Sequence, residues 1–402
     1  METYINDIIT GVYTFPLIAF LLTLPYMAIQ YHRYGSISFW KSLLVYAFVF
    51  YLICAYFMVI LPLPAEHKAA ACGAVSVQPC LTPFRFVGDF AEAAEAVGLS
   101  VNPSTWAAFL KQGSVYTTLF NVLLTLPLGV FARYLLNMRW WQALMLGLCM
   151  TLFYEFSQLT GLWGIYDYAY RLFDVDDLIV NTFGCMLGFW IAVPLQHHLP
   201  DFDKINDRMI EKGENRASFT RRAIGFVVDL LLSIVLAVAV YVIASLNCGV
   251  AIADAVPIFF VTSGFFFILM PLFTRGQTLG HKVVRVCIKR RDGSPATRWH
   301  IFWRNALFVW VFLQAPGLFM YFVPAELYDG VIFAVAIAVL GIVYIVWALS
   351  LLIRAIRSAF KHSFVMLNGI ISNTTITPVK RKIEHTDAND IQNASSSAHI
   401  EK

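Results

Sequence analysis

Long apolar segments determine what this chain can fold into. Each runs for about 20 residues, the length that crosses the hydrocarbon core of a bilayer as a helix. Of the 402 residues, 59% are hydrophobic and only 13% are charged, which is far from the composition of soluble domains. We therefore predict an all-α, polytopic integral membrane protein with about nine transmembrane helices. The predicted spans are 8–30, 40–61, 114–136, 140–160, 178–197, 221–246, 254–274, 302–323 and 330–353.

The positions of lysine and arginine predict the orientation. If the connections after the first, third, fifth and seventh spans lie on the same side as the C-terminal tail, that side holds 25 of the 29 Lys and Arg residues. Positively charged loops stay in the cytoplasm, so we predict the N-terminus outside and the C-terminus inside. Basic residues beside spans contact the head groups of membrane lipids. The net charge of +4 therefore gives no indication of nucleic-acid binding.

Polar side chains interrupt the apolar sequence between residues 155 and 188. Ionisable groups near the membrane interior are costly and are usually kept for function. Glu155 and Gln158 are three residues apart and so share one face of the helix predicted over 140–160. If this helix and the next one form a hairpin, seven polar residues gather at the outer face: Glu155, Gln158, Arg171, Asp174, Asp176, Asp177 and Asn181.

The helix predicted over 178–197 carries a stripe of polar and small residues. The positions recur at intervals of four, three and four residues, which places them on one face. Glycine lets another helix backbone approach closely, so the two glycines are predicted to form a helix contact. Asn121, in the span over 114–136, is predicted to hydrogen-bond between helices. The stripe consists of Asp177, Asn181, Gly184 and Gly188.

This polar cluster has a structural and a functional interpretation. In the first, Arg171 neutralises one or two carboxylates, and Asp174 or Asp176 caps a helix. That leaves Glu155 unexplained, because an anion near a helix C-terminus meets the unfavourable end of the dipole. In the second, which we favour, the cluster is a functional polar pocket. It would bind a head group, bind Mg²⁺ or Ca²⁺ through carboxylate oxygens, or perform acid–base chemistry, with binding the leading option.

Catalytic and cofactor motifs are missing from the sequence. No Ser or Cys near the cluster has a His close in sequence to activate it as a nucleophile, and no Cys/His spacing predicts a zinc site. We expect no cofactor. Cys72 and Cys80 share the predicted outer loop, where a disulfide is permitted; whether they pair stays open.

A second polar pair lies in the half of the chain after residue 217. Arg222 and Asp229 are seven residues apart and so share a helix face, two turns from each other. A buried ion pair is the simpler interpretation, and a proton or cation relay is the alternative. Further along, Asp292 and Gly293 predict a turn after a β-like run.

The two halves resemble two known families of bacterial membrane proteins. The first is similar, over 10–198, to the VanZ family, named for a member that raises resistance to the glycopeptide teicoplanin. The second is similar, over 215–360, to the RDD family, for which transport has been suggested in some members. The VanZ resemblance rests on the segment from Asn121 to Gly129, on Glu155 with Gln158, and on the run from Arg171 to Gly188. The RDD resemblance rests on Arg222, Asp229, Thr278, Gly280, Asp292, Gly293 and Arg304.

These resemblances imply an organisation and a function. The expected order is a VanZ-like five-span domain (1–198), a cytoplasmic linker (199–216), an RDD-like four-span domain (217–360) and a polar, disordered cytoplasmic tail (361–402). The VanZ resemblance implies a multi-pass protein of the bacterial cytoplasmic membrane, linked to glycopeptide resistance. Its expected partner is a lipid or a lipid-linked cell-wall precursor. The alternatives are an RDD-type transporter coupled through Asp229 and an intramembrane enzyme using Glu155 or Asp174 as acid or base.

Overall fold

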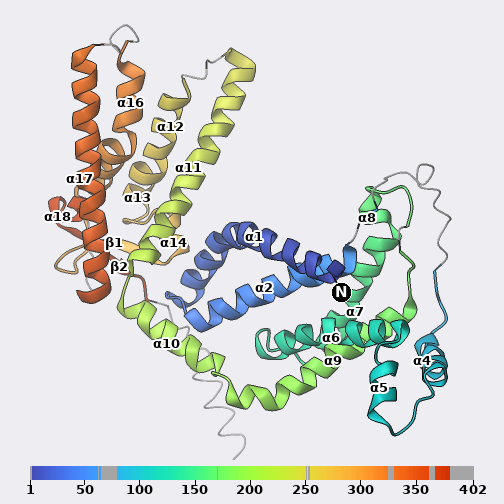
Figure 1. Cartoon of the computed structure of the whole chain (residues 1–402). Helices are drawn as coiled ribbons and strands as arrows, with labels where there is room; N and C mark the ends of the chain where they lie inside the picture. The colour runs from blue at the N-terminus through green and yellow to red at the C-terminus, as the bar shows by residue number, and fades with distance from the viewer. Residues whose placement is uncertain are drawn as a thin grey trace, which may run out of the picture. The chain divides into compact units, whose positions relative to one another are not determined.

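The described part of the chain is mostly helical, as the composition predicts (Figure 1). The structure is a computed structural model that describes residues 2–61, 63–64, 79–169, 171–249, 251, 254–324, 330–361 and 367–380. It divides into two compact units, and helix α1 (Glu2–Tyr34) contributes to both. Unit 1 contains Met1–Thr23 and Ser38–Ile205, and unit 2 contains Leu24–Ile37 and Asn206–Lys402.

Seven helices in the described part of the chain are long and apolar enough to cross a membrane. The chain is therefore a multi-pass membrane protein. These helices are Val12–Tyr34, Phe39–Ile60, Gly113–Tyr134, Val175–His198, Phe219–Cys248, Ala255–Phe273 and Val331–Ser350.

Two further segments that were predicted to span are helical but do not belong to this set. One is α7 (Trp140–Leu159), and the other is the succession of α15 (Arg298–Ala306), η4 (Leu307–Gln314) and α16 (Ala315–Phe322). The second is interrupted because η4 is a π-helix and a proline stands in the first turn of α16, where it cannot donate a hydrogen bond to the preceding turn. The number nine and the orientation stay predictions.

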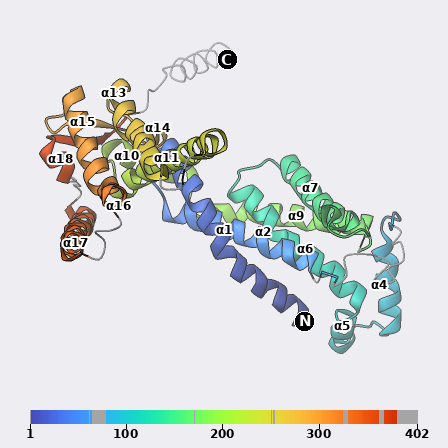
Figure 2. The ribbon, with the colours of Figure 1, turned by 90° about the horizontal axis from the view of Figure 1, so that it is seen from above.

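Unit 1 is a bundle of helices in which α6 packs tightly against α9, as both views show (Figure 1, Figure 2). A Cβ atom added at Gly129 of α6 would lie 1.8 Å from the carbonyl oxygen of Cys185, and one added at Gly188 of α9 would lie 1.9 Å from that of Leu126. Only glycine permits this approach. The elements are α2 (Phe39–Ile60), α4 (Arg85–Ala96), α5 (Pro103–Phe109), α6 (Gly113–Tyr134), α7, α8 (Gly161–Gly164), α9 (Val175–Leu195) and η1 (Gln196–His198).

Unit 2 combines long helices with a small base that contains two strands. A buried apolar core at this base joins Tyr31, Val284, Ile288, Ile301 and Ile376. Figure 1 shows the strands and α14 near one end of α11. The elements not yet given are α10 (Phe202–Asn215), α11 (Phe219–Cys248), α12 (Ala255–Gly264), η3 (Phe265–Leu269), α13 (Met270–Phe273), α14 (Leu279–Val283), β1 (Val286–Arg290), α17 (Val331–Lys361), α18 (Leu367–Ile371) and β2 (Thr374–Pro378).

The tail after residue 361, which was predicted to be disordered, contains regular structure. Strand β2 pairs antiparallel with β1, from Val286 opposite Pro378 to Arg290 opposite Thr374. Thr374 and Ile376 are buried and alternate with less buried residues, the pattern of a strand with one face on the core. The polar composition of the tail concealed this short strand. Residues 381–402 of the predicted tail lie outside the described residues.

The boundary between the units also differs from the predicted one. Residues 24–37 belong to unit 2, although the prediction placed them in the VanZ-like domain (1–198). The hydroxyl of Tyr31 contacts that of Thr220, and Ser36 Oγ donates to the carbonyl of Met209 at 2.8 Å. The assignment of residues 24–37 to unit 2 depends on contacts between residues nearly 200 positions apart, which local sequence patterns do not predict.

Candidate functional site

Arg171 and Gln158 lie at the C-terminal end of α2. The Arg171 guanidinium donates to the carbonyls of Val59 and Leu61 at 2.9 and 3.0 Å, and Gln158 Nε2 donates to that of Val59 at 2.8 Å. The last carbonyls of a helix lack intrahelical partners and attract cations. Arg171 therefore caps α2. No carboxylate of the described residues lies within 4.0 Å of it, so the expected neutralising ion pair is not formed.

Glu155 is buried and interacts with the N-terminal end of α9. Its Oε2 accepts a hydrogen bond from the backbone N–H of Asp174 at 3.0 Å. Asp174 is itself the N-cap of α9, and its Oδ1 accepts from the N–H of Asp176 at 2.9 Å. The positive end of the α9 dipole thus compensates in part for the position of Glu155 near the C-terminus of α7.

Asp176 faces a different part of unit 1. Its two carboxylate oxygens accept hydrogen bonds from the backbone N–H groups of Phe84 and Phe86, at 2.6 and 2.9 Å. Phe84 has a φ of 62°, a left-handed conformation at the start of α4. Asp176 therefore holds the start of α4 in place, a structural role that Glu155 does not share.

Whether Cys72 and Cys80 form a disulfide stays open, because Cys72 lies outside the described residues.

Asp177 and Asn121 join α9 to α6. Asn121 Nδ2 donates to Asp177 Oδ1 at 2.7 Å. One turn deeper, Asn181 is only 6% exposed, and its Oδ1 has no hydrogen-bond partner among the described residues. Gly184 and Gly188 continue this face, where α6 approaches most closely.

The structure brings Glu155, Asp174 and Asp177 together with Arg171, close enough for their charges to act on one another. We call the three acidic residues the carboxylate group. Within the described residues, no three His, Cys, Asp or Glu side chains are placed to share a metal ion. One carboxylate oxygen of each of these residues accepts a hydrogen bond from another described residue. The second oxygens can accept hydrogen bonds from hydroxyl or ammonium groups of a ligand.

In unit 2, Asp229 does not pair with Arg222. Asp229 is 1% exposed; it accepts hydrogen bonds from the Thr278 hydroxyl and, at 2.7 Å, from the backbone N–H of Gly280. Arg222 Nη2 donates to the carbonyl of Ile376 at 3.0 Å. The two side chains thus have different hydrogen-bond partners. The predicted ion pair between Arg222 and Asp229 is therefore wrong.

Arg221 is a buried residue that the sequence interpretation missed. It is 2% exposed and donates to the carbonyls of Val284 and Gly213, each at 2.6 Å, and of Arg285 at 2.8 Å. The available signal was Ser218, whose Oγ accepts from the N–H of Arg221 at 3.2 Å and caps α11. The cap fixes where α11 begins and places Arg221 in its first turn, but the carbonyls that Arg221 contacts lie in other segments.

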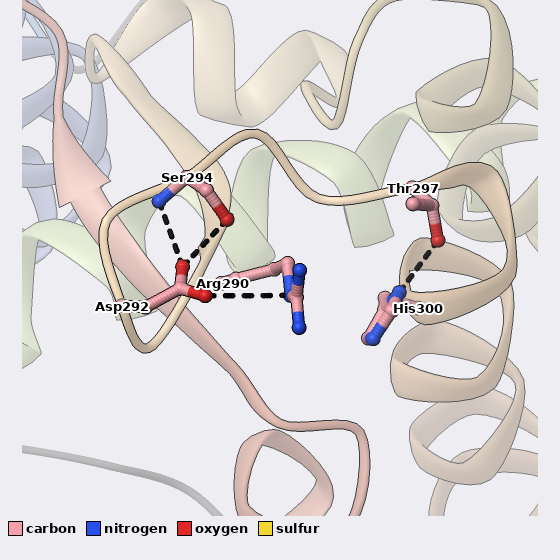
Figure 3. A network of polar contacts seen from close by, with 5 residues as sticks. All are labelled: Arg290, Asp292, Ser294, Thr297 and His300. Carbon is pink, nitrogen blue, oxygen red and sulfur yellow. Dashed lines mark hydrogen bonds and ion pairs between the residues drawn. The ribbon is translucent and has the colours of Figure 1, made fainter.

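Asp292 has a local structural role in the turn after β1 (Figure 3). Its Oδ1 accepts hydrogen bonds from the backbone N–H and the hydroxyl of Ser294, and its Oδ2 lies 3.8 Å from Nε of Arg290. The bonds from Ser294, with a smaller contribution from the charge of Arg290, hold the pKa of Asp292 below its usual value. Short polar side chains that bond the backbone two residues on are typical of turns.

The fold and these helix-end contacts define a helical, multi-pass membrane protein with two separate polar regions. Residues 48–196 match the VanZ/LLP1 family, and residues 216–361 match the RDD family. The chain thus carries a VanZ region followed by an RDD region, which confirms the two resemblances. No curated protein and no solved structure matches the chain.

Proposed function

We propose that the VanZ region binds the polar head of a lipid or of a lipid-linked cell-wall precursor, at the outer face of a bacterial cytoplasmic membrane. Binding there would contribute to resistance against teicoplanin-type glycopeptides. The observation that carries the proposal is the carboxylate group beside Arg171, at the meeting of the ends of α2, α7 and α9. The distribution of Lys and Arg supports an outer location for this cluster. The link to the antibiotic rests on the family resemblance.

The electrostatics of the cluster favour a ligand that donates hydrogen bonds. The Arg171 guanidinium donates hydrogen bonds to two backbone carbonyls. Within the described residues, no basic side chain forms an ion pair shorter than 4.0 Å with the carboxylate group. Leaving charged groups at a membrane surface without such balance is costly. The hydroxyl and ammonium groups of a sugar–peptide head would satisfy the second oxygens of these carboxylates.

Neutralising the cluster is expected to abolish teicoplanin protection. Glu155→Gln and Asp177→Asn keep the side-chain shape but remove the charge, and Arg171→Ala releases the end of α2. Each should return the minimal inhibitory concentration of teicoplanin to that of cells lacking the protein, while membrane levels stay normal. Glu92→Gln, an exposed carboxylate on α4, is the matched control and should keep full protection. Full protection in all three cluster variants would exclude the cluster from the mechanism.

Transport by the RDD region is the second candidate function. Asp229 is buried in a predicted span, and it accepts hydrogen bonds from the neutral groups of Thr278 and Gly280. An acidic side chain at such a position is suited to couple proton or cation movement.

Removing the Asp229 carboxylate should stop any gradient-driven flux. We expect vesicles with the parent protein to show pH- or ion-gradient-dependent flux, and vesicles with Asp229→Asn to show none. Asp254→Asn serves as control, since Asp254 bonds locally to the N–H of Ala251 at 3.1 Å. Absence of gradient-dependent flux in the parent protein rejects this candidate.

A further inference from the structure

Three basic side chains gather at the base of unit 2. Arg304 of α15 is 3% exposed, and its charge and that of Arg222 of α11 act on His281 of α14. The charge of Arg222 also acts on Arg304. Among the described residues, no carboxylate lies within 4.0 Å of Arg304. Like charges buried together are expected only where an anion or strong acceptors offset their repulsion.

The segment Leu367–Pro378 covers this basic cluster with neutral acceptors. Arg304 Nη1 donates to Thr374 Oγ1 at 2.8 Å, and Arg222 Nη2 donates to the carbonyl of Ile376 at 3.0 Å. A Cβ added at Gly369 would lie 2.6 Å from Arg304 Nη1, so this glycine packs directly on the guanidinium. The segment thus occupies the side of the cluster where an anion would bind.

One ring nitrogen of His281, the third basic residue of the cluster, makes no hydrogen bond to the described residues. The Nδ1 atom is buried without a hydrogen-bond partner among the described residues. Burial, followed by the charges of Arg304 and Arg222, lowers the pKa of His281 to about 3. The ring is therefore neutral at physiological pH in this arrangement, and an anion next to it would favour its protonation.

We propose that Arg304, Arg222 and His281 form a binding site for a phosphate group, and that Leu367–Pro378 covers this site when it is empty. A phosphate oxygen replaces Thr374 Oγ1 as the acceptor of Arg304, because arginine binds phosphate through short, charge-assisted hydrogen bonds. The phosphate belongs to the head group of an anionic lipid or is free inorganic phosphate. Its binding displaces β2 from β1. This site is independent of the proposed function of the VanZ region.

Cys287 provides a direct test of the displacement. It lies opposite Thr377 in the paired strands, with Cys287 Sγ 3.5 Å from Thr377 Oγ1. Facing residues of antiparallel strands have Cα atoms about 4.5–5.5 Å apart, within reach of a disulfide. Thr377→Cys should therefore cross-link to Cys287 under mild oxidation while β2 is in place, and mass spectrometry of the linked peptide measures the rate.

The full chain is compared in vesicles of phosphatidylcholine, of phosphatidylcholine with phosphatidylglycerol, and of phosphatidylcholine with inorganic phosphate, with sodium chloride matching the ionic strength. We expect cross-linking to slow severalfold with phosphatidylglycerol if the ligand is a lipid head group, or with inorganic phosphate if it is the free anion. Equal rates in all three conditions overturn the proposal.

Two variants separate phosphate binding from a merely structural contact. Arg304→Gln should make cross-linking insensitive to phosphate, whereas Thr374→Val, which removes only the covering hydroxyl, should make it more sensitive. If Arg304→Gln does not fold, Thr374→Val decides alone. A phosphate response in Thr374→Val no greater than that of the parent contradicts the proposal.

Discussion

Gly129→Ala is expected to disrupt the packing of α6 against α9 and to lower the thermal unfolding midpoint of the protein sharply. The added methyl carbon would lie 1.8 Å from the carbonyl oxygen of Cys185 and 2.5 Å from the backbone nitrogen of Phe189. Both are backbone atoms, so the helices themselves must separate. Inserting atoms into a close-packed contact costs about 1–3 kcal/mol and sometimes more. We expect the upper part of that range.

The same helix offers a control for this experiment. Gly113 begins α6, and a Cβ added there meets no atom within 4 Å. Gly113→Ala should therefore leave the midpoint unchanged, measured by size-exclusion chromatography of the detergent-solubilised protein after heating. Equal midpoints for the two variants would mean that α6 and α9 are not in backbone contact.

The α6–α9 contact was partly predictable from sequence. The spacing of Gly184 and Gly188 indicated a close helix contact, and Asn121 was assigned an interhelical hydrogen bond. The identity of the opposing helix was not available, because it depends on which spans lie next to each other. The close contact of Gly129 with the backbone of Cys185 can be recognised only once α6 and α9 are known to be neighbours.

The candidate site shows the same limit. The sequence grouped Asp176 with Asp177, but in the structure Asp176 binds the start of α4, and Asp177 bonds to Asn121. The structural interpretation paired Arg171 with a carboxylate, but in the structure Arg171 caps α2. In both cases the partner is a backbone group far along the chain. Backbone amides and carbonyls leave no trace in side-chain patterns, so such partners cannot be predicted from residue type.

Replacement of Arg221 is expected to destabilise unit 2 strongly. Its guanidinium satisfies three carbonyls from two separate segments: that of Gly213 in α10, and those of Val284 and Arg285 before β1. Arg221→Met removes all of these donors and leaves the carbonyls buried. Each unsatisfied buried group costs about 1–3 kcal/mol. A loss of several kcal/mol should prevent the variant from accumulating as a folded, monodisperse protein.

Arg221→Lys tests whether geometry or charge is responsible. Lysine keeps the positive charge, but its single ammonium cannot reproduce the planar fork that reaches three carbonyls. We therefore expect Arg221→Lys to rescue little of the lost stability, whereas Arg208→Gln, at an exposed position of α10, should behave like the parent protein. Folded protein yield and thermal midpoint measure both. If lysine restored full stability, a positive charge at the start of α11 would be sufficient, and the role of Arg221 as a bridge between segments would be refuted.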